Sequence, residues 1–234
     1  MTDYILCGDS WAEKAFDNDN YNKEKTDQDI CIADMLIGNY DTCITPGYGN
    51  LDVLDKLVNS KVNENMPLLW IFTEPGRDWG RVYNVDEFDW LKLENYIDLR
   101  QECIDLILRE ISNTIKNPIA FIGGLSDFTT QIKLPSNWTV IHKSWQEFIA
   151  NQLPDNRFKF GWGASDVGWR MFSNNVVPSQ QLTFLWDEQI KEWCYWEDNG
   201  YFCHEHPTLK ATREFAEFIS EDFNQWLNKT KVTK

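Results

Sequence analysis

The stretch YILCGDSWAEKAF, residues 4–16, contains the two elements that decide the fold. Its first four residues, Tyr4 to Cys7, are typical of a buried strand. The run that begins at Ala12 has the pattern of a helix start. Gly8, Asp9 and Ser10 lie between the two, so a polar tripeptide stands where a first strand gives way to a first helix.

The same alternation of strand and helix continues along the chain. Apolar runs predict further strands at Thr42–Thr45, Leu68–Thr73, Ile119–Gly123 and Thr139–His142. Helical spacing places Leu51, Leu54, Leu57 and Val58 on one face, and Ile97 to Ile115 carries a similar stripe. A last amphipathic helix is predicted from about Thr208 to Leu227. This order predicts an α/β fold, a three-layer αβα sandwich built on a parallel five-stranded sheet.

The length of 234 residues fits one domain, and we expect a single α/β domain over residues 1–234. One segment, at about 158–200, lacks clear periodicity and is rich in tryptophan, glycine and asparagine. We interpret it as an insertion in the domain. Most of the 12 tryptophans are expected to line the core or a pocket.

Charge and composition disfavour several classes of partner. Lysine and arginine number 22 against 37 acidic residues, a net charge of −15. This balance disfavours nucleic acid, whose binding depends on phosphate contacts, and it disfavours anionic membranes. The N-terminus lacks the pattern of a signal peptide, and no apolar run has the length of a membrane span. The prediction is a cytoplasmic or otherwise intracellular protein.

The cysteines indicate neither a disulfide framework nor a metal site. There are 6 of them, none forms a C-x-x-C pair, and most lie in apolar or periodic segments. We therefore expect reduced thiols, no structural zinc and no cofactor. The oligomeric state stays open.

Ser10 is the first candidate for chemistry. Ligands of open parallel sheets bind at the carboxyl ends of the strands, and Ser10 directly follows the first predicted strand. Its hydroxyl is therefore placed to act as a nucleophile. The alternative is that Ser10 or Asp9 only caps the following helix.

A serine nucleophile needs a base, and the chain has only 3 histidines. His142 closes a predicted strand, which favours a structural role. His204 and His206 lie directly before the last helix. His206 is the sharper candidate, because Pro207 holds it in a fixed, non-helical conformation.

Two further predicted strands also end in polar loops. After the second strand, Gly47 and Asn50 are placed to donate hydrogen bonds at the same edge of the sheet. After the third come Thr73, Glu74 and Arg77, which are candidates for substrate binding. The alternatives are a turn with an asparagine cap, and a surface ion pair between Glu74 and Arg77.

Together these motifs resemble the SGNH, or GDSL-type, hydrolase family. The matching residues are Gly8-Asp9-Ser10 after the first strand, Gly47 after the second, and His206-Pro207 before the last helix. The resemblance covers residues 4–227. It implies a flavodoxin-like sandwich and hydrolysis of an ester by a serine nucleophile. It also implies an oxyanion hole made by the serine N–H, the glycine N–H and an asparagine side chain.

The sequence departs from the family at two positions. The family's asparagine after the third strand is absent, since Thr73 and Glu74 stand there, and Asn50 or Arg77 would have to replace it. Where the family has an aspartate, three residues before the histidine, this chain has Cys203. Asp198 is our first candidate for the orienting acid, with Glu205 second. A backbone carbonyl and a Ser-His dyad remain further options.

Two functions follow. The first is a serine hydrolase that cleaves an O-acyl ester of a small molecule or a glycan, with Ser10 as nucleophile and His206 as base. The second is a catalytically silent binding, structural or assembly protein on the same fold. Cys203 and the missing asparagine favour the second; the presence of both Ser10 and His206 favours the first.

Overall fold

We describe the protein from a computed structural model of residues 1–234. The described residues are 2–13, 15, 30–73, 75–83, 96–124, 128, 130–145, 148, 186–187, 192–193, 202–203 and 206–232. Side chains are not described at 76, 96–100, 186–187, 192–193, 202–203, 206 and 232.

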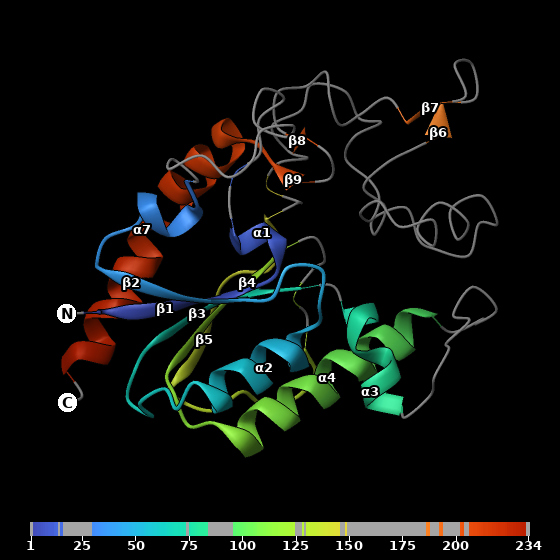
Figure 1. Ribbon diagram of the computed structural model, residues 1–234, viewed down its shortest axis with the longest axis horizontal. Helices are drawn as coiled ribbons and strands as arrows, with labels where there is room; N and C mark the ends of the chain where they lie inside the picture. The colour runs from blue at the N-terminus through green and yellow to red at the C-terminus, as the bar shows by residue number, and fades with distance from the viewer. Residues whose placement is uncertain are drawn as a thin grey trace.

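The centre of the fold is a five-stranded, wholly parallel sheet (Figure 1). Its strands are β1 (Tyr4–Gly8), β2 (Tyr40–Ile44), β3 (Leu68–Phe72), β4 (Ile119–Gly123) and β5 (Trp138–His142). They lie in the order β2-β1-β3-β4-β5, which is the flavodoxin-like arrangement. The predicted α/β fold is confirmed, and each predicted strand matches an observed one to within two residues at either end.

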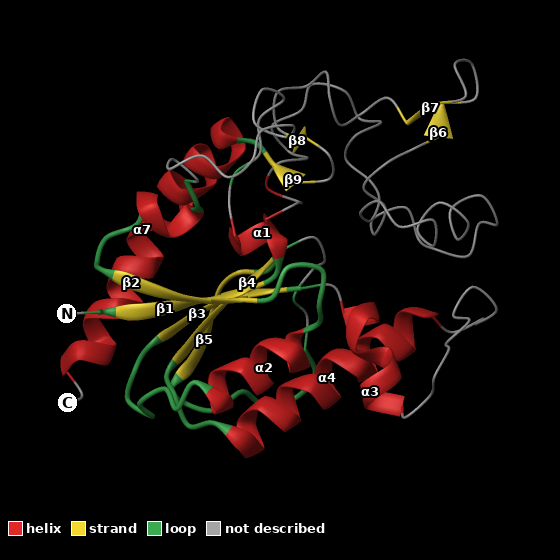
Figure 2. Cartoon of the chain, in the orientation of Figure 1, coloured by secondary structure: helices red, strands yellow, loops and turns green. Residues whose placement is uncertain are grey.

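The helices form two layers on either side of the sheet (Figure 2). One layer contains α2 (Asn50–Asn59) and α4 (Tyr96–Thr114). The other contains the 3-10 turn η1 (Ile32–Met35) and the long helix α7 (Leu209–Val232). The short elements α1 (Ser10–Glu13), η2 (Pro75–Asp78) and α3 (Trp79–Tyr83) follow β1 and β3.

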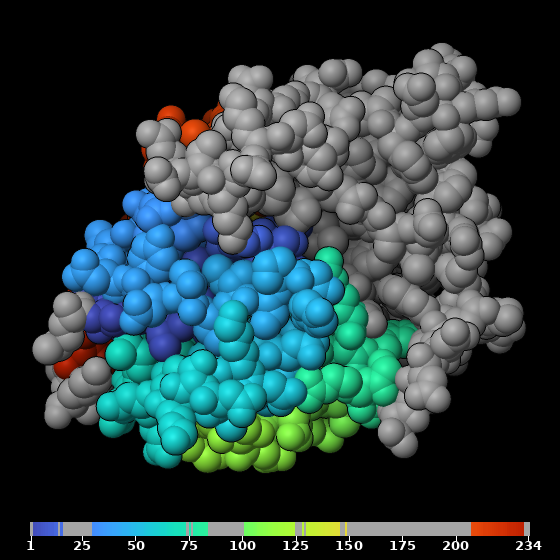
Figure 3. All heavy atoms as spheres, viewed as in Figure 1, coloured from blue at the N-terminus to red at the C-terminus, as the bar shows by residue number. Residues whose placement is uncertain are grey.

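Alternation along the central strands explains why both faces of the sheet are covered. In β1, Tyr4 and Leu6 point to the α7 layer, while Ile5 and Cys7 point to the α2 and α4 layer. All five residues of β1, β3 and β4 are buried, as expected for a parallel sheet packed on both sides. Figure 3 shows the side chains of α2 and α4 packed beside each other on one outer surface.

The apolar face of α2 differs from the prediction at one position. Leu51, Leu54 and Leu57 are buried as expected, but Val58 is 48% exposed. Val53 is buried in its place, because the inward face of the helix is centred on residues 53, 54 and 57. The prediction for Val58 was therefore wrong.

The last helix begins as its sequence indicates. The Thr208 hydroxyl accepts a hydrogen bond from the N–H of Ala211 at 3.2 Å, so Thr208 is the N-cap and Leu209 the first helical residue. The inward face carries Phe215, Ile219 and Phe223, all buried. The predicted segment of Thr208 to Leu227 thus matches α7, which continues to Val232.

Most of the tryptophan-rich insertion lies outside the described residues. Within it the structure describes an antiparallel pair, β6 (Trp186–Asp187) with β7 (Glu192–Trp193). A second pair follows, β8 (Phe202–Cys203) with β9 (His206–Pro207), and it leads directly into α7.

Cys7, Cys31, Cys43 and Cys103 are buried thiols outside any disulfide, as predicted. Cys194 and the side chain of Cys203 lie outside the described residues. Among the helices of the described part, none is long and apolar enough to cross a membrane.

Candidate functional site

The candidate site lies at the carboxyl edge of the sheet, between the loops that follow β1 and β3. Strand order reverses there, because β2 lies on one side of β1 and β3 on the other. Open parallel sheets bind ligands at this topological switch point. Ser10 directly follows β1, and Thr73 and Arg77 follow β3, so the fold brings these predicted residues to one edge.

Asp9 caps the helix that begins at Ser10. One oxygen of its carboxylate accepts a hydrogen bond from the Trp11 N–H at 3.0 Å, and its carbonyl accepts one from the Ala12 N–H at 3.0 Å. Asp9 is therefore the N-cap, and Ser10 is the first helical residue. Helix capping thus explains the aspartate and gives no reason for the serine.

The second oxygen of Asp9 joins the loop after β1 to the loop after β3. It accepts a hydrogen bond from the Thr73 hydroxyl at 2.6 Å and another from Nη1 of Arg77 at 3.1 Å. The Asp9 side chain is 3% exposed, whereas that of Arg77 is 31% exposed. The buried Asp9 carboxylate therefore holds the Arg77 guanidinium, while part of the Arg77 side chain lies at the surface.

The Asn50 side chain forms its hydrogen bonds with buried groups in the interior of the protein. Its amide nitrogen donates to the Thr73 carbonyl at 3.2 Å and to Asp78 at 3.1 Å. Its amide oxygen accepts from the Trp70 ring N–H at 3.3 Å and from the Thr73 N–H at 3.0 Å. Both amide hydrogens are thereby used. Asn50 clamps the end of β3 to the start of α2 and has no hydrogen left for a substrate.

Asp78 caps α2 from a distant part of the chain. Its carboxylate accepts hydrogen bonds from the N–H groups of Asn50 at 2.8 Å and Leu51 at 2.9 Å. A Cβ at Gly49 would lie 2.2 Å from this carboxylate, which explains the glycine at the N-cap. Burial raises the pKa of Asp78 to about 6, although these hydrogen bonds act in the opposite direction.

Two other glycines have conformations that the site requires. Gly47 has a φ of +79° in the turn from Thr45 to Tyr48, which the Tyr48 N–H closes by donating to the Thr45 carbonyl at 3.1 Å. Proline followed by glycine with this φ defines a type II turn. A Cβ at Gly8 would lie 2.9 Å from the Ile71 carbonyl oxygen, so only glycine fits where β1 meets β3.

The predicted base reaches the same edge from the other end of the chain. The backbones of α1, which begins with Ser10, and β9, which begins with His206, lie within 8 Å of each other (Figure 1). The His206 side chain is outside the described residues. The aromatic rings of Trp11, Trp145 and Phe215 stand in contact, with centroids 5.6 and 4.9 Å apart, and they tie α1 to α7.

Cys203 lies opposite His206 in the backbone register of the β8–β9 pair. The predicted orienting acids Asp198 and Glu205, and the predicted binding residue Glu74, lie outside the described residues. His142 has a different environment: its Nδ1 accepts the Ser144 N–H at 3.2 Å and its ring contacts Phe215 and Phe218.

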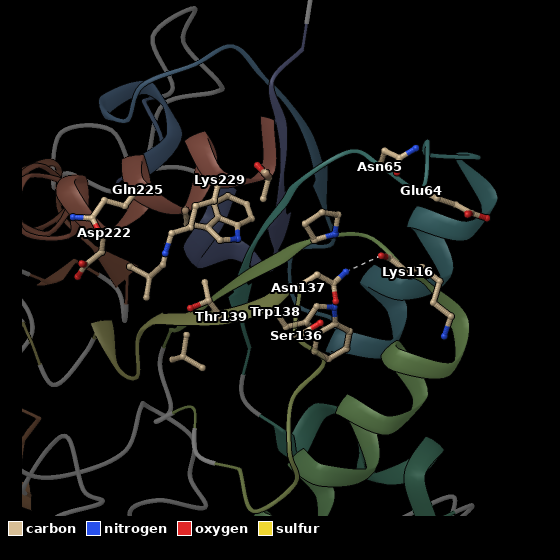
Figure 4. Close-up of a pocket in the computed structure, with 15 residues that line it drawn as sticks. Glu64, Asn65, Lys116, Ser136, Asn137, Trp138, Thr139, Asp222, Gln225 and Lys229 are labelled. Atoms are coloured by element: carbon tan, nitrogen blue, oxygen red, sulfur yellow. Dashed lines mark hydrogen bonds between the residues drawn. The ribbon is translucent and has the colours of Figure 1, made fainter. Parts of the chain in front are cut away.

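A groove of about 710 Å³ runs along β5 on a different part of the surface (Figure 4). Its walls include Lys116 and Asn137, which precede β4 and β5, and Gln225 of α7. The Asn137 amide donates to the Lys116 carbonyl at 2.9 Å across one end. The amino ends of the strands lie there, so this groove is separate from the edge that carries Ser10.

Sequence reasoning did not assign a site role to Asp9 or Asp78, although both are buried and organise the site. The signal available was weak: each is an acidic residue close to the end of an apolar strand.

Comparisons with protein-family models, with curated proteins and with solved structures gave no match to this chain.

Proposed function

We propose that this protein is a serine hydrolase of the SGNH type that cleaves an O-acyl ester. Ser10 is the nucleophile and His206 the general base. The observation that carries the proposal is the contact between α1 and β9, because it brings the elements that begin with these two residues together at the switch point of the sheet.

The reaction has two halves. His206 accepts the Ser10 proton while Oγ attacks the ester carbonyl, and the tetrahedral adduct then collapses as the imidazolium returns that proton to the leaving alcohol. A water molecule next attacks the acyl-serine with His206 again as base. The acid product leaves and Ser10 regains its proton, so no cofactor is needed.

The capping arrangement supports a chemical role for Ser10. Because the Asp9 carboxylate already caps α1, the serine hydroxyl is not required for the helix to begin. The Ser10 N–H and the Gly47 N–H are the proposed oxyanion donors. Asn50 is proposed as a positioning residue, because it fixes Thr73 and Asp78 rather than facing a substrate.

A catalytically silent binding or assembly protein is the second candidate. The sequence at β8 and β9 favours it, because the residue paired with His206 in the backbone register is Cys203, which has no carboxylate to orient an imidazole. The engaged Asn50 amide removes one predicted oxyanion donor as well.

Hydrolysis of para-nitrophenyl butyrate by the wild type, Ser10→Ala and His206→Ala tests the proposal. Both variants should lose about a thousandfold or more in kcat. Ser10→Ala should keep its free energy of unfolding within about 0.5 kcal/mol. His142→Ala serves as the control, because His142 contacts Ser144, Phe215 and Phe218, and it should retain activity. Equal activity in Ser10→Ala and wild type would refute the proposal.

A further inference from the structure

Arg77 lies beside Asp9 at the candidate site, and within the described part of the chain one nitrogen of its guanidinium, Nη1, is engaged. Its Nη1 contacts Asp9 Oδ2 at 3.1 Å, and among the residues that the structure describes Asp9 is its only hydrogen-bond partner. A guanidinium presents further N–H donors in a fixed planar fork. The Arg77 side chain is 31% exposed, so part of it lies at the surface, where a ligand can arrive.

The loop that carries Arg77 is fixed at both ends. At its start, Thr73 is bound by Asn50 through its backbone and by Asp9 through its hydroxyl. At its end, Asp78 is bound to the first turn of α2. The guanidinium therefore needs little reorganisation when a ligand arrives.

The charges around Arg77 favour an anionic ligand. The Asp9 charge is buried and shared among the Trp11 N–H, the Thr73 hydroxyl and Arg77, so it orients the guanidinium from the protein side. The chain has a net charge of −15, so an anionic ligand should bind preferentially at a fixed cation such as Arg77, which lies at the switch point of the sheet.

We infer that Arg77 binds an anionic group of the substrate, a carboxylate or a phosphate, and that the ester cleaved is therefore an acidic one. That the ligand is an ester rests on the proposed function. Binding of an anion by Arg77 does not depend on it. Arg77 forms a charge-assisted, bidentate contact with this group while Ser10 reacts with the ester carbonyl nearby.

Two matched esters test the specificity. Para-nitrophenyl hexanoate and para-nitrophenyl hydrogen adipate differ chiefly in a methyl group against a carboxylate, and the adipate chain is too long for its carboxylate to attack its own ester readily. Arg77→Met should lower kcat/KM for the adipate ester about 10- to 100-fold more than for the hexanoate ester. Arg77→Lys should have a smaller selective effect, since it keeps the charge but loses the fork. An equal loss for both esters would overturn the inference, because Arg77 would then serve the oxyanion or the fold.

Arg81→Met is the matched control, because Arg81 is partly exposed and pairs with Asp52 and Asp55 of α2 rather than with Asp9. It should leave the ratio of the two esters unchanged.

A binding measurement separates this inference from the proposed function. Succinate and inorganic phosphate are titrated separately into the wild type, Arg77→Met, Arg77→Lys and Arg81→Met by calorimetry, at low and high salt. Binding of either anion to the wild type and Arg81→Met, weakened in Arg77→Met and by added salt, supports the site even if no ester is cleaved. The tighter anion distinguishes a carboxylate from a phosphate site. Absence of binding, or equal binding to Arg77→Met, would overturn it.

Discussion

Asp9 and Arg77 form an ion pair with 3.1 Å between Oδ2 and Nη1, and this pair joins the loops after β1 and β3 at the candidate site. The carboxylate also accepts the Thr73 hydroxyl at 2.6 Å. A residue beside the proposed nucleophile therefore decides how the opposite loop is held.

Asp9→Asn should lower the free energy of unfolding by about 2 kcal/mol, because a buried carboxylate with charge-assisted hydrogen bonds is lost. Urea denaturation measures the change. Asp55→Asn is the control, since the Asp55 side chain is 59% exposed and pairs with Arg81; it should change stability by less than about 1 kcal/mol. Equal effects of the two substitutions would show that the Asp9 contacts are not stabilising.

Asn50→Ala should destabilise the protein by about 3 kcal/mol, because it leaves the Trp70 ring N–H and the Thr73 backbone N–H without their buried partner and removes one of the hydrogen bonds to Asp78. Thermal and urea unfolding report this loss. Asn63→Ala is a suitable control, since Asn63 is exposed and, among the residues described, its side chain bonds only to the N–H of nearby Asn65. A variant of unchanged stability that lost only kcat would instead make Asn50 an oxyanion donor.

The raised pKa of Asp78 predicts a dependence of stability on pH. The folded protein holds this proton up to a pH of about 6, whereas the unfolded chain loses it near the ordinary aspartate pKa of 3.8. The contribution of Asp78 to the free energy of unfolding is therefore fully present below about pH 4 and falls by up to about 3 kcal/mol as pH rises to about 6.

Asp78→Asn removes that titration, so the difference in stability between wild type and variant should change across this range. Urea unfolding of both proteins at several pH values measures it. A difference that stays constant with pH would mean that the carboxyl has its ordinary pKa in the folded protein.

Cys203→Asp should increase the rate of ester hydrolysis. Directly opposed positions of an antiparallel pair are close enough for their side chains to interact, and Cys203 is opposite His206 in register. A carboxylate there would hold the imidazole in the required tautomer. Rates of para-nitrophenyl butyrate hydrolysis give the comparison.

If Cys203→Asp folds but gains nothing, Asp198→Asn and Glu205→Gln decide between the remaining explanations. A large loss in one of them would identify the orienting acid already present. Wild-type activity in all three variants would leave a backbone carbonyl or a Ser-His dyad as the arrangement.

The parallel sheet was predictable because its central strands are short, continuous apolar runs separated by helical patterns. Ile119–Gly123 matches β4 at both ends for this reason. The side-chain network was not predictable. Arg77 lies 68 residues from Asp9 in the chain, and only the register of β1 beside β3 brings them together.

The role of Asn50 shows why residue type alone was insufficient. An amide at the end of a strand can face a substrate or the interior, and the sequence does not distinguish the two. The outcome depends on Asp78 and Trp70, whose buried side chains form hydrogen bonds with the Asn50 amide. Ser10 was identified because glycine, aspartate and serine follow an apolar strand, a local pattern that needs no distant partner.

Labelling with a fluorophosphonate probe, followed by mapping of the modified peptide by mass spectrometry, shows whether Ser10 is the nucleophile. In this reaction the serine oxygen forms a bond to phosphorus and fluoride leaves, so only an activated serine reacts quickly. The account predicts one modified residue, Ser10, with labelling abolished in Ser10→Ala and strongly slowed in His206→Ala. A folded protein that is not labelled, or is labelled at another serine such as Ser144, would contradict it.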